Sequence, residues 1–231
     1  MSGEDTRERI LKTAFKLFHE QGYHATGVAA IVREAGINPG SMYHAFASKE
    51  LLLENVLEYA LASEGPAQAE PVEAATADPI ERVFALVGRY RESMARSGCR
   101  LGCPIGRLAL EVSDSHTEAR ELIGRHFENW VARVGSWLDA AGERLPGTTD
   151  RRRLARLVLT VIEGGLMQAR AAGDLAPFDD AVAQLRDHFR CLQQVAAGAS
   201  GAAPEPLPPA PAPEPVARRQ PRDGAFVWDD R

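Results

Sequence analysis

Apolar residues recur at the three- and four-residue spacing of an amphipathic helix along most of this chain. In residues 4–21, Ile10, Ala14 and Leu17 share one face, and Gly22 follows as a favourable helix stop. The same spacing predicts further helices over residues 28–35, 38–46, 78–97, 115–141, 150–172 and 178–197, and a connecting helix that starts at Ser48. The chain is therefore predicted to be all-α, with about nine helices.

Residues 26–46 contain two short predicted helices joined by a tight turn. Thr26 is a favourable N-cap for the first of these helices, and Gly36 can adopt the left-handed conformation of a C-cap. Asn38 can cap the second helix, with Pro39 as its first residue. Two short helices around a Gly-containing turn are typical of the helix-turn-helix motif, here residues 27–46, in which the second helix lies in the DNA major groove.

The second helix of this motif has the residues of a DNA-contacting surface. Gly40 and Ser41 are small, and their amides at a positive helix end suit a phosphate. Tyr43 and His44 are expected to reach phosphates, and no second ligand at metal spacing accompanies His44. Met42 and Phe46 are expected to pack inward. The full set of predicted DNA contacts is Thr26, Asn38, Pro39, Gly40, Ser41, Tyr43, His44 and Lys49.

Residues 10–57 resemble the DNA-binding region of TetR-family transcriptional repressors. The resemblance rests on three pieces in order, Gly-Tyr-x-x-Thr from residue 22, Ala-Gly-Ile-x-x-Gly from residue 35 and Tyr-x-x-Phe-x-Ser-Lys-Glu from residue 43. Lys49 matches a lysine that commonly touches the DNA backbone in that family. Its place at a helix N-terminus opposes the helix dipole, and a nearby phosphate would reverse that cost. Ala45 and Ala47 depart from the family pattern.

Composition narrows the class of protein. The chain has 231 residues, of which 45% are hydrophobic, so it can bury a sizeable core in one large or two small domains. A net charge of −5 excludes a generally basic nucleic-acid coat and allows a local DNA-binding face. Residues 1–10 are charged and polar, unlike a signal peptide, and no apolar run approaches the roughly 18 residues of a membrane span. With three cysteines, the default location is the reduced cytoplasm.

The pattern also divides the chain. Residues 4–64 form a DNA-binding head, whose fourth helix is a buried connector and the natural lever for a ligand signal. Residues 65–78, rich in Pro, Ala and Glu, are expected to be a mobile loop, and residues 78–197 a helical ligand-binding and dimerisation domain. Residues 198–231 hold eight of the fifteen prolines and are expected to be a disordered tail.

Residues 98–113 begin with two cysteines close to a helix start. This Gly-Cys-Pro segment resembles a subgroup of TetR-like proteins that includes the lincomycin-resistance and flavonoid-responsive repressors, where it lines the region of the effector pocket. Cys99 and Cys103 are interpreted as buried small hydrophobes, with redox sensing as an alternative because a positive helix end lowers a thiol pKa. A zinc site would need further ligands, and only His116 is near.

The resemblance implies a dimer formed by the last two helices as an intersubunit four-helix bundle. The Glu163-Gly164-Gly165 run suits such close helix contacts, despite a cost of about 1 kcal/mol for each glycine. An apolar planar ligand suits a pocket lined by the large side chains of the second domain, which are Tyr90, Leu108, Phe127, Trp130, Trp137 and Met167.

No catalytic motif or phosphate loop appears, so neither an enzyme nor a cofactor is expected. Glu111, Asp114 and His116 are close in sequence and are expected to cap and start a helix. The predicted function is a homodimeric repressor released from a palindromic operator by a small apolar or aromatic effector. The alternatives are an activator, a redox-responsive regulator acting through Cys99 and Cys103, and a helical interaction module that has lost DNA binding.

Overall fold

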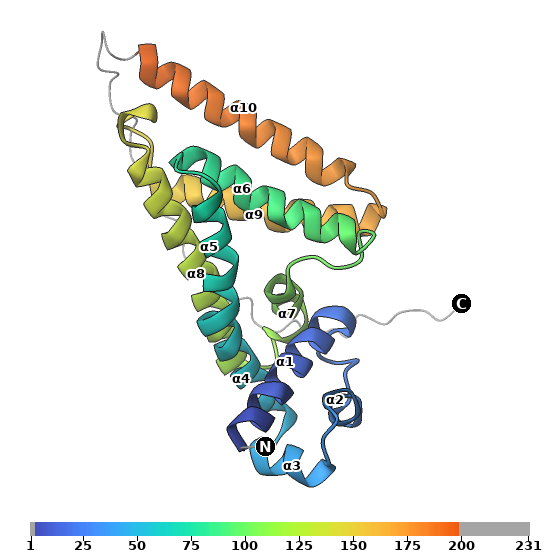
Figure 1. Ribbon diagram of the computed structural model, residues 1–231. Coiled ribbons are helices and arrows are strands. Elements are labelled where there is room, and N and C mark those ends of the chain that lie inside the picture. Colours follow the sequence, from blue (N-terminus) through green and yellow to red (C-terminus); the bar gives the residue numbers. More distant parts are fainter. Residues whose placement is uncertain (1–2, 199–231) are drawn as a thin grey trace, which may run out of the picture.

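The computed structural model describes residues 3–198, and these residues form ten α-helices and no strand (Figure 1). This agrees with the all-α prediction of about nine helices. The predicted tail lies outside the described residues, except for Gly198. The elements are α1 Gly3–Gln21, α2 Val28–Ala35, α3 Pro39–Ala45, α4 Lys49–Tyr59, a π-helix Ala60–Glu64, α5 Gly65–Ala75, α6 Pro79–Arg96, α7 Pro104–Val112, α8 Thr117–Ala140, a 3₁₀ turn Gly142–Arg144, α9 Arg151–Ala172 and α10 Ala176–Gly198.

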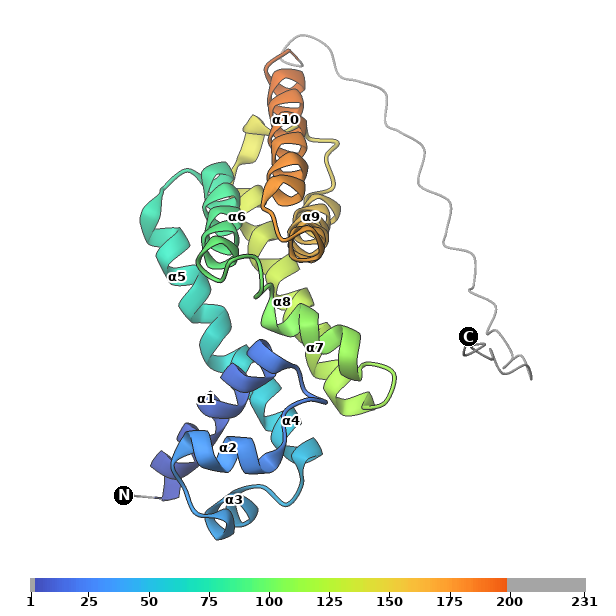
Figure 2. The same ribbon diagram turned by 90° about the vertical axis from the view of Figure 1, so that its right-hand side faces the viewer.

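Helices α1, α2 and α3 form a small head at one end of the molecule, and the first turns of α4 pack against it (Figures 1 and 2). Gly22 ends α1 with a φ of +92°, which favours glycine. The chain can then reverse, and the Tyr23 ring packs edge-on against Phe18, with 5.4 Å between ring centroids. The head core is closed from α2 and α3 by Ile31 and Met42, both buried. The Tyr23 ring thus packs over the last turns of α1.

The connector between head and body is longer than predicted. Helix α4 continues through the π-helix into α5, so the expectation of a mobile loop over residues 65–78 is wrong. Pro71 lies inside α5, but Ala69 and Val72 are only 2% and 1% exposed. Burial of this face offsets the poor helix propensity of the segment. Leu51, predicted to be buried, is 40% exposed.

The body consists of α6 and α8–α10, and short α7 lies between these helices and the head (Figure 2). The Asp78 and Asp150 side chains cap α6 and α9, each accepting a backbone N–H bond of 2.9 Å. At Gly165 of α9, a Cβ would lie 2.8 Å from Cδ2 of Phe178 in α10. Gly165 is therefore explained by close packing within one chain.

None of the helices in residues 3–198 combines the length and the apolar character needed to cross a bilayer.

Candidate DNA-binding face and effector cavity

Helix α3 is anchored on one side and free on the other. The Asn38 side chain accepts a hydrogen bond of 2.8 Å from the Ser41 amide, and Pro39 is the first helical residue, as predicted. Met42 and Phe46 are each 1% exposed, which confirms that they pack inward. Tyr43, in contrast, is 63% exposed. The core contacts therefore fix the orientation of α3 while its outer face remains open to a ligand as large as DNA.

Arg7 of α1 braces the C-terminal end of α3, a role that the sequence did not suggest. Its Nη1 donates to the Ala45 carbonyl at 2.8 Å, and its guanidinium lies 4.3 Å from the centroid of the Phe46 ring. The outer face of α3 itself presents Gly40, Tyr43 and His44, and α3 contains no Lys or Arg. Binding of DNA by this helix would therefore depend on backbone amides and neutral side chains more than on bulk charge.

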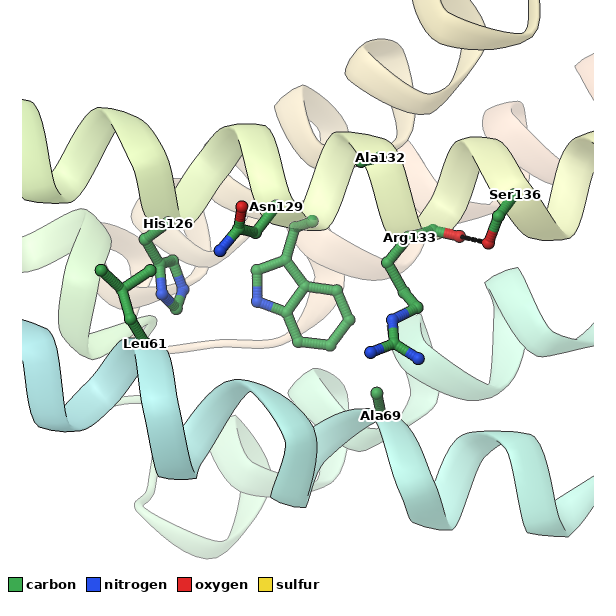
Figure 3. Close-up of a pocket in the computed structure, with 8 residues that line it drawn as sticks. Leu61, Ala69, His126, Asn129, Ala132, Arg133 and Ser136 are labelled. Carbon is green, nitrogen blue, oxygen red and sulfur yellow. Dashed lines mark hydrogen bonds between the residues drawn. The ribbon is translucent and has the colours of Figure 1, made fainter.

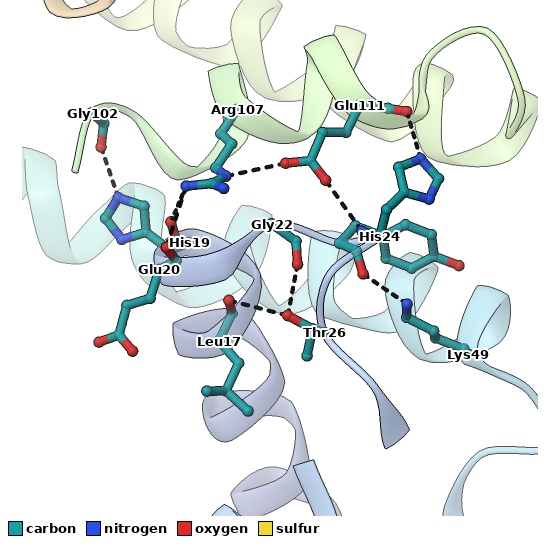
Figure 4. Close-up of polar contacts among 11 residues, drawn as sticks. Leu17, His19, Glu20, Gly22, His24, Thr26, Lys49, Gly102, Arg107 and Glu111 are labelled. Atoms are coloured by element: carbon teal, nitrogen blue, oxygen red, sulfur yellow. Dashed lines mark hydrogen bonds and ion pairs between the residues drawn. The ribbon is translucent and has the colours of Figure 1, made fainter. Parts of the chain in front are cut away.

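Thr26 has a different place from the one predicted. Helix α2 is capped by Gly27 without a side-chain hydrogen bond, so the N-cap prediction for Thr26 is wrong. The side chain is fully buried, and its hydroxyl donates to the Gly22 carbonyl at 2.6 Å, with the Leu17 carbonyl at 3.3 Å (Figure 4). Because no surface of Thr26 faces outward, we correct its role from DNA contact to support of the α1–α2 turn.

Replacing Thr26 with Val is expected to lower the free energy of unfolding by about 1–3 kcal/mol, because it leaves buried carbonyl oxygens without their donor. Thr26→Ser retains the hydroxyl and serves as the matched control, with a smaller loss. Chemical denaturation of both variants measures the difference. Equal stability of the valine and serine variants would contradict the assigned role of the hydroxyl.

Lys49 ties the start of α4 to the α1–α2 turn. Its Nζ donates to the Tyr23 carbonyl at 2.7 Å and lies 4.2 Å from the centroid of the Tyr23 ring. Burial lowers the pKa of Lys49, with the neighbouring carboxylates of Glu50 and Glu111 acting in the opposite direction. A phosphate contact by Lys49 stays a prediction, and this lysine also has an internal structural partner.

A polar clamp, formed by His19 and His24 of the head with Arg107 and Glu111 of α7, joins the head to the body (Figure 4). Arg107 Nη1 donates to the His19 carbonyl at 3.2 Å, and its Nε donates to Glu111 at 3.1 Å. The Glu111 carboxylate accepts from the His24 amide at 3.2 Å, and the His24 ring lies 3.0 Å from the Glu111 carbonyl. The His19 ring bonds the Gly102 carbonyl at 2.8 Å.

The sequence prediction missed this clamp. Glu111 was expected to cap a helix, but its side chain lies in the middle of the interface between head and α7. The Glu111 carboxylate also lies against Gly22, where a Cβ would overlap Glu111 Oε1 and displace that side chain. Periodicity could not reveal the pairing, because its two sides are far apart in the sequence.

The six predicted pocket residues do not surround one cavity. Phe127 and Met167 line an open cavity of about 570 Å³ between α7, α8 and α9. Tyr90 and Trp130 line a separate hollow of about 280 Å³ between α1, α6, α7 and α8. Leu108 and Trp137 are core residues, 1% and 3% exposed, and the Trp137 indole N–H donates to Glu73 at 3.1 Å. The prediction of a single aromatic pocket is therefore wrong.

A third hollow, of about 450 Å³, runs between the connector and α8 (Figure 3). Leu61 and Ala69 line it from the connector, and His126, Trp130 and Arg133 from α8. His126 is 8% exposed, and burial lowers its pKa to about 4. Its imidazole is therefore neutral at neutral pH.

The cysteines near α7 are both buried. Cys103 is the N-cap of α7, and its Sγ accepts from the Gly106 amide at 3.3 Å. Burial, with Glu163 close by, raises the pKa of the Cys103 thiol well above its ordinary value, so the predicted lowering is wrong at this position. Among the residues that the structure describes, no group of His, Cys, Asp and Glu gathers into a metal site.

An anchored helix with an open outer face, on a helix-turn-helix head and a larger helical body, defines a DNA-binding transcription regulator. Residues 10–56 match the model of bacterial regulatory proteins of the tetR family, and residues 79–184 match that of the C-terminal domain of LmrA/YxaF-like transcriptional regulators. The chain belongs to the TetR family. Its members are regulators and not enzymes, in agreement with the prediction, and the subgroup resemblance of the C-terminal region is confirmed.

Two relatives from Bacillus subtilis cover most of both chains. The uncharacterized HTH-type transcriptional regulator YxaF is 32% identical over 175 residues, which are 75% of this chain and 89% of the relative. The HTH-type transcriptional regulator LmrA is 31% identical over 183 residues, which are 77% and 93%. The crystal structure of the reduced form of Escherichia coli NemR has the same fold, with a TM-score of 0.73 and 24% identity over 79% of this chain and 96% of that one.

Proposed function

We propose that this chain is a homodimeric transcriptional repressor that binds a palindromic operator in the cytoplasm and is released by a small, mainly apolar effector. Two copies of α3 would lie about one DNA turn, near 34 Å, apart in successive major grooves. The contacts proposed from each head are those of the predicted set without Thr26, namely Asn38, Pro39, Gly40, Ser41, Tyr43, His44 and Lys49.

One observation supports effector control most directly, the position of α7. Its residues Gly106, Ala109 and Leu110 line the cavity against α8 and α9, while Arg107 and Glu111 on the same helix hold the head. A ligand that moves α7 in the cavity therefore also moves the points that hold the α1–α2 turn. Helix α7 acts here together with the connector that the sequence suggested as the lever.

The coupling needs a ligand that prefers one of two arrangements of α7. Its preference sets the loss of operator affinity, typically about 1–3 kcal/mol for one coupled pair of sites. A polar clamp suits such a two-state element, because its bonds are made in one arrangement and broken in the other. The DNA-competent form would be the one with the clamp closed.

The surface of α9 and α10 supports the proposed dimer. Leu157 and Met167 on α9 are 41% and 58% exposed, and Val195 on α10 is 53% exposed. These residues would be covered if α9 and α10 met their copies in a four-helix bundle.

The test is a gel shift with the DNA upstream of its own gene, titrated with salt and then with a panel of apolar compounds. We expect a shift that weakens with salt and is reversed by one class of compound. Arg107→Met, which breaks the clamp, should bind DNA more weakly even without the compound, whereas Arg125→Met, an exposed position on α8, should bind and respond as the natural protein does. Absence of any shift at low salt would favour the helical interaction module that has lost DNA binding. If deletion of the gene for this protein lowered transcription of the regulated genes, the protein would instead be an activator.

The redox alternative leads to a separate prediction. Cys99 and Cys103 are buried and Cys191 is exposed, so a thiol reagent such as DTNB is expected to react rapidly with one thiol per native chain. Cys191→Ser should remove the rapid phase, and the remaining thiols should react only on unfolding. Rapid modification of Cys103, accompanied by loss of operator binding in peroxide, would restore the redox-responsive interpretation.

A further inference from the structure

The cavity between α7, α8 and α9 contains a carboxylate without a basic partner. Glu163 of α9 lines this cavity beside the Cys103 thiol, which favours the charged form of the carboxyl group. Burial raises the pKa of Glu163, and no Lys, Arg or His of residues 3–198 forms an ion pair with it. Burying a carboxylate without a cation lowers the free energy of unfolding. A binding role would explain why Glu163 lies here.

The start of α7 is built around this carboxylate. A Cβ at Gly106 would overlap Glu163 Oε2, so a larger residue there would displace the Glu163 side chain. The Cys103 sulfur accepts from the Gly106 amide while its thiol faces Glu163. The Cys-Pro-Ile-Gly segment that stands out in the sequence therefore holds Glu163 in one place on the cavity wall.

The remainder of the wall is mainly apolar, with Val131, Leu159 and Leu166 beside the Phe127 ring. Its basic side chains lie in other pairs or in solvent. Arg107 pairs with Glu111 at 3.1 Å and Arg156 pairs with Glu128 at 2.7 Å, whereas Arg170 is exposed. Glu163 is the one acidic side chain among the lining residues, and Arg170 lies where the cavity opens to solvent.

We propose that this cavity binds an organic cation, a protonated amine carried on an apolar or aromatic body, with its ammonium group on Glu163. The inference rests on the proposed function, since it names the class of effector. The ammonium group supplies the charge-assisted hydrogen bonds that the carboxylate lacks. Phe127 lines the same cavity, and an aromatic ring can add to the attraction for a cation there. A volume of about 570 Å³ fits a ligand of drug size.

Calorimetric titration of the full-length protein tests this with three probes that share one body, 1-naphthylmethylamine, 1-naphthylmethanol and 1-naphthoate. We expect the amine to bind at least about tenfold more tightly than the alcohol, as a hydrogen bond to a charged group implies, and the anion to bind least. Glu163→Gln should bring amine and alcohol within about threefold of each other. Glu121→Gln, an exposed position on α8, is the matched control and should keep the preference.

The proposal is overturned if the natural protein binds amine and alcohol equally, prefers naphthoate, or binds none of the three. It is also overturned if the amine preference survives in Glu163→Gln. Should that variant fail to fold, the comparison of probes on the natural protein decides alone. A gel shift on the same preparation separates the two proposals, because DNA binding without amine preference overturns only this one, and amine binding without DNA binding overturns only the repressor.

Discussion

A carboxylate in place of Tyr43 is expected to abolish operator binding at physiological salt while leaving the fold intact. The side chain is 63% exposed on α3, so Tyr43→Asp should change the free energy of unfolding by no more than about 0.5 kcal/mol. At the DNA, the change removes a proposed phosphate contact and places a negative charge beside a polyanion. A penalty of about 3 kcal/mol for each operator half is about a hundredfold per half, and about ten-thousandfold for a dimer on both halves.

Two control variants distinguish loss of the Tyr43 phosphate contact from the effect of the added negative charge. Tyr43→Phe removes only the hydroxyl and should cost less than about tenfold in affinity. Ala140→Asp adds the same charge at an exposed position at the far end of α8 and should leave operator binding within a few fold. Gel shifts and thermal unfolding of all three variants check the expectation. Operator binding by Tyr43→Asp equal to that of the natural protein would show that α3 does not face the DNA with this side.

Gly165→Ala is expected to destabilise the protein although alanine is the better helix former. The added Cβ would lie 2.8 Å from the Phe178 ring, and Phe178 is fully buried at the start of α10. Overpacking of this kind costs about 1–3 kcal/mol, and each kcal/mol lowers the Tm of a chain of this size by about 2–4 °C. The proposed dimer should weaken as well, because α10 supplies part of its surface.

The neighbouring glycine provides the matched control. Gly164→Ala meets no atom of the same chain within 4 Å, so the monomer should gain up to about 1 kcal/mol from lower backbone entropy in the unfolded state. Differential scanning calorimetry and sedimentation velocity measure both variants. Opposite shifts in Tm are expected, and a destabilising Gly164→Ala that also dissociates the dimer would place that glycine at the contact between subunits.

Several features were predictable from residues close together in the sequence. The caps at Asn38, Asp78 and Asp150, the left-handed Gly36 and the inward packing of Met42 and Phe46 all follow from local propensity and helical spacing. Helix caps and side-chain directions can be predicted here because each depends on atoms within one turn of a helix. The outer face of α3 was predictable for the same reason, since the inward residues fix which side remains exposed.

Other features depend on residues far apart in the chain. Thr26 is a residue type that commonly forms an N-cap. In the buried α1–α2 turn, however, its hydroxyl bonds to the carbonyls of Leu17 and Gly22. Residues 65–75 suit a loop by their composition, but packing of Ala69 and Val72 made them helical. In both cases the free energy of burial exceeds the small local preference.

The sequence alone therefore determined the all-helical fold class, the helix-turn-helix motif and the family. Each of these depends on the spacing of residues that are close together in the sequence. Only the tertiary structure decided how Arg107 and Glu111 hold the head, and how Gly106 of α7 and Glu163 of α9 share one cavity wall. Such contacts join side chains through space across separate helices. Their energies come from desolvation and close packing, which no local pattern encodes.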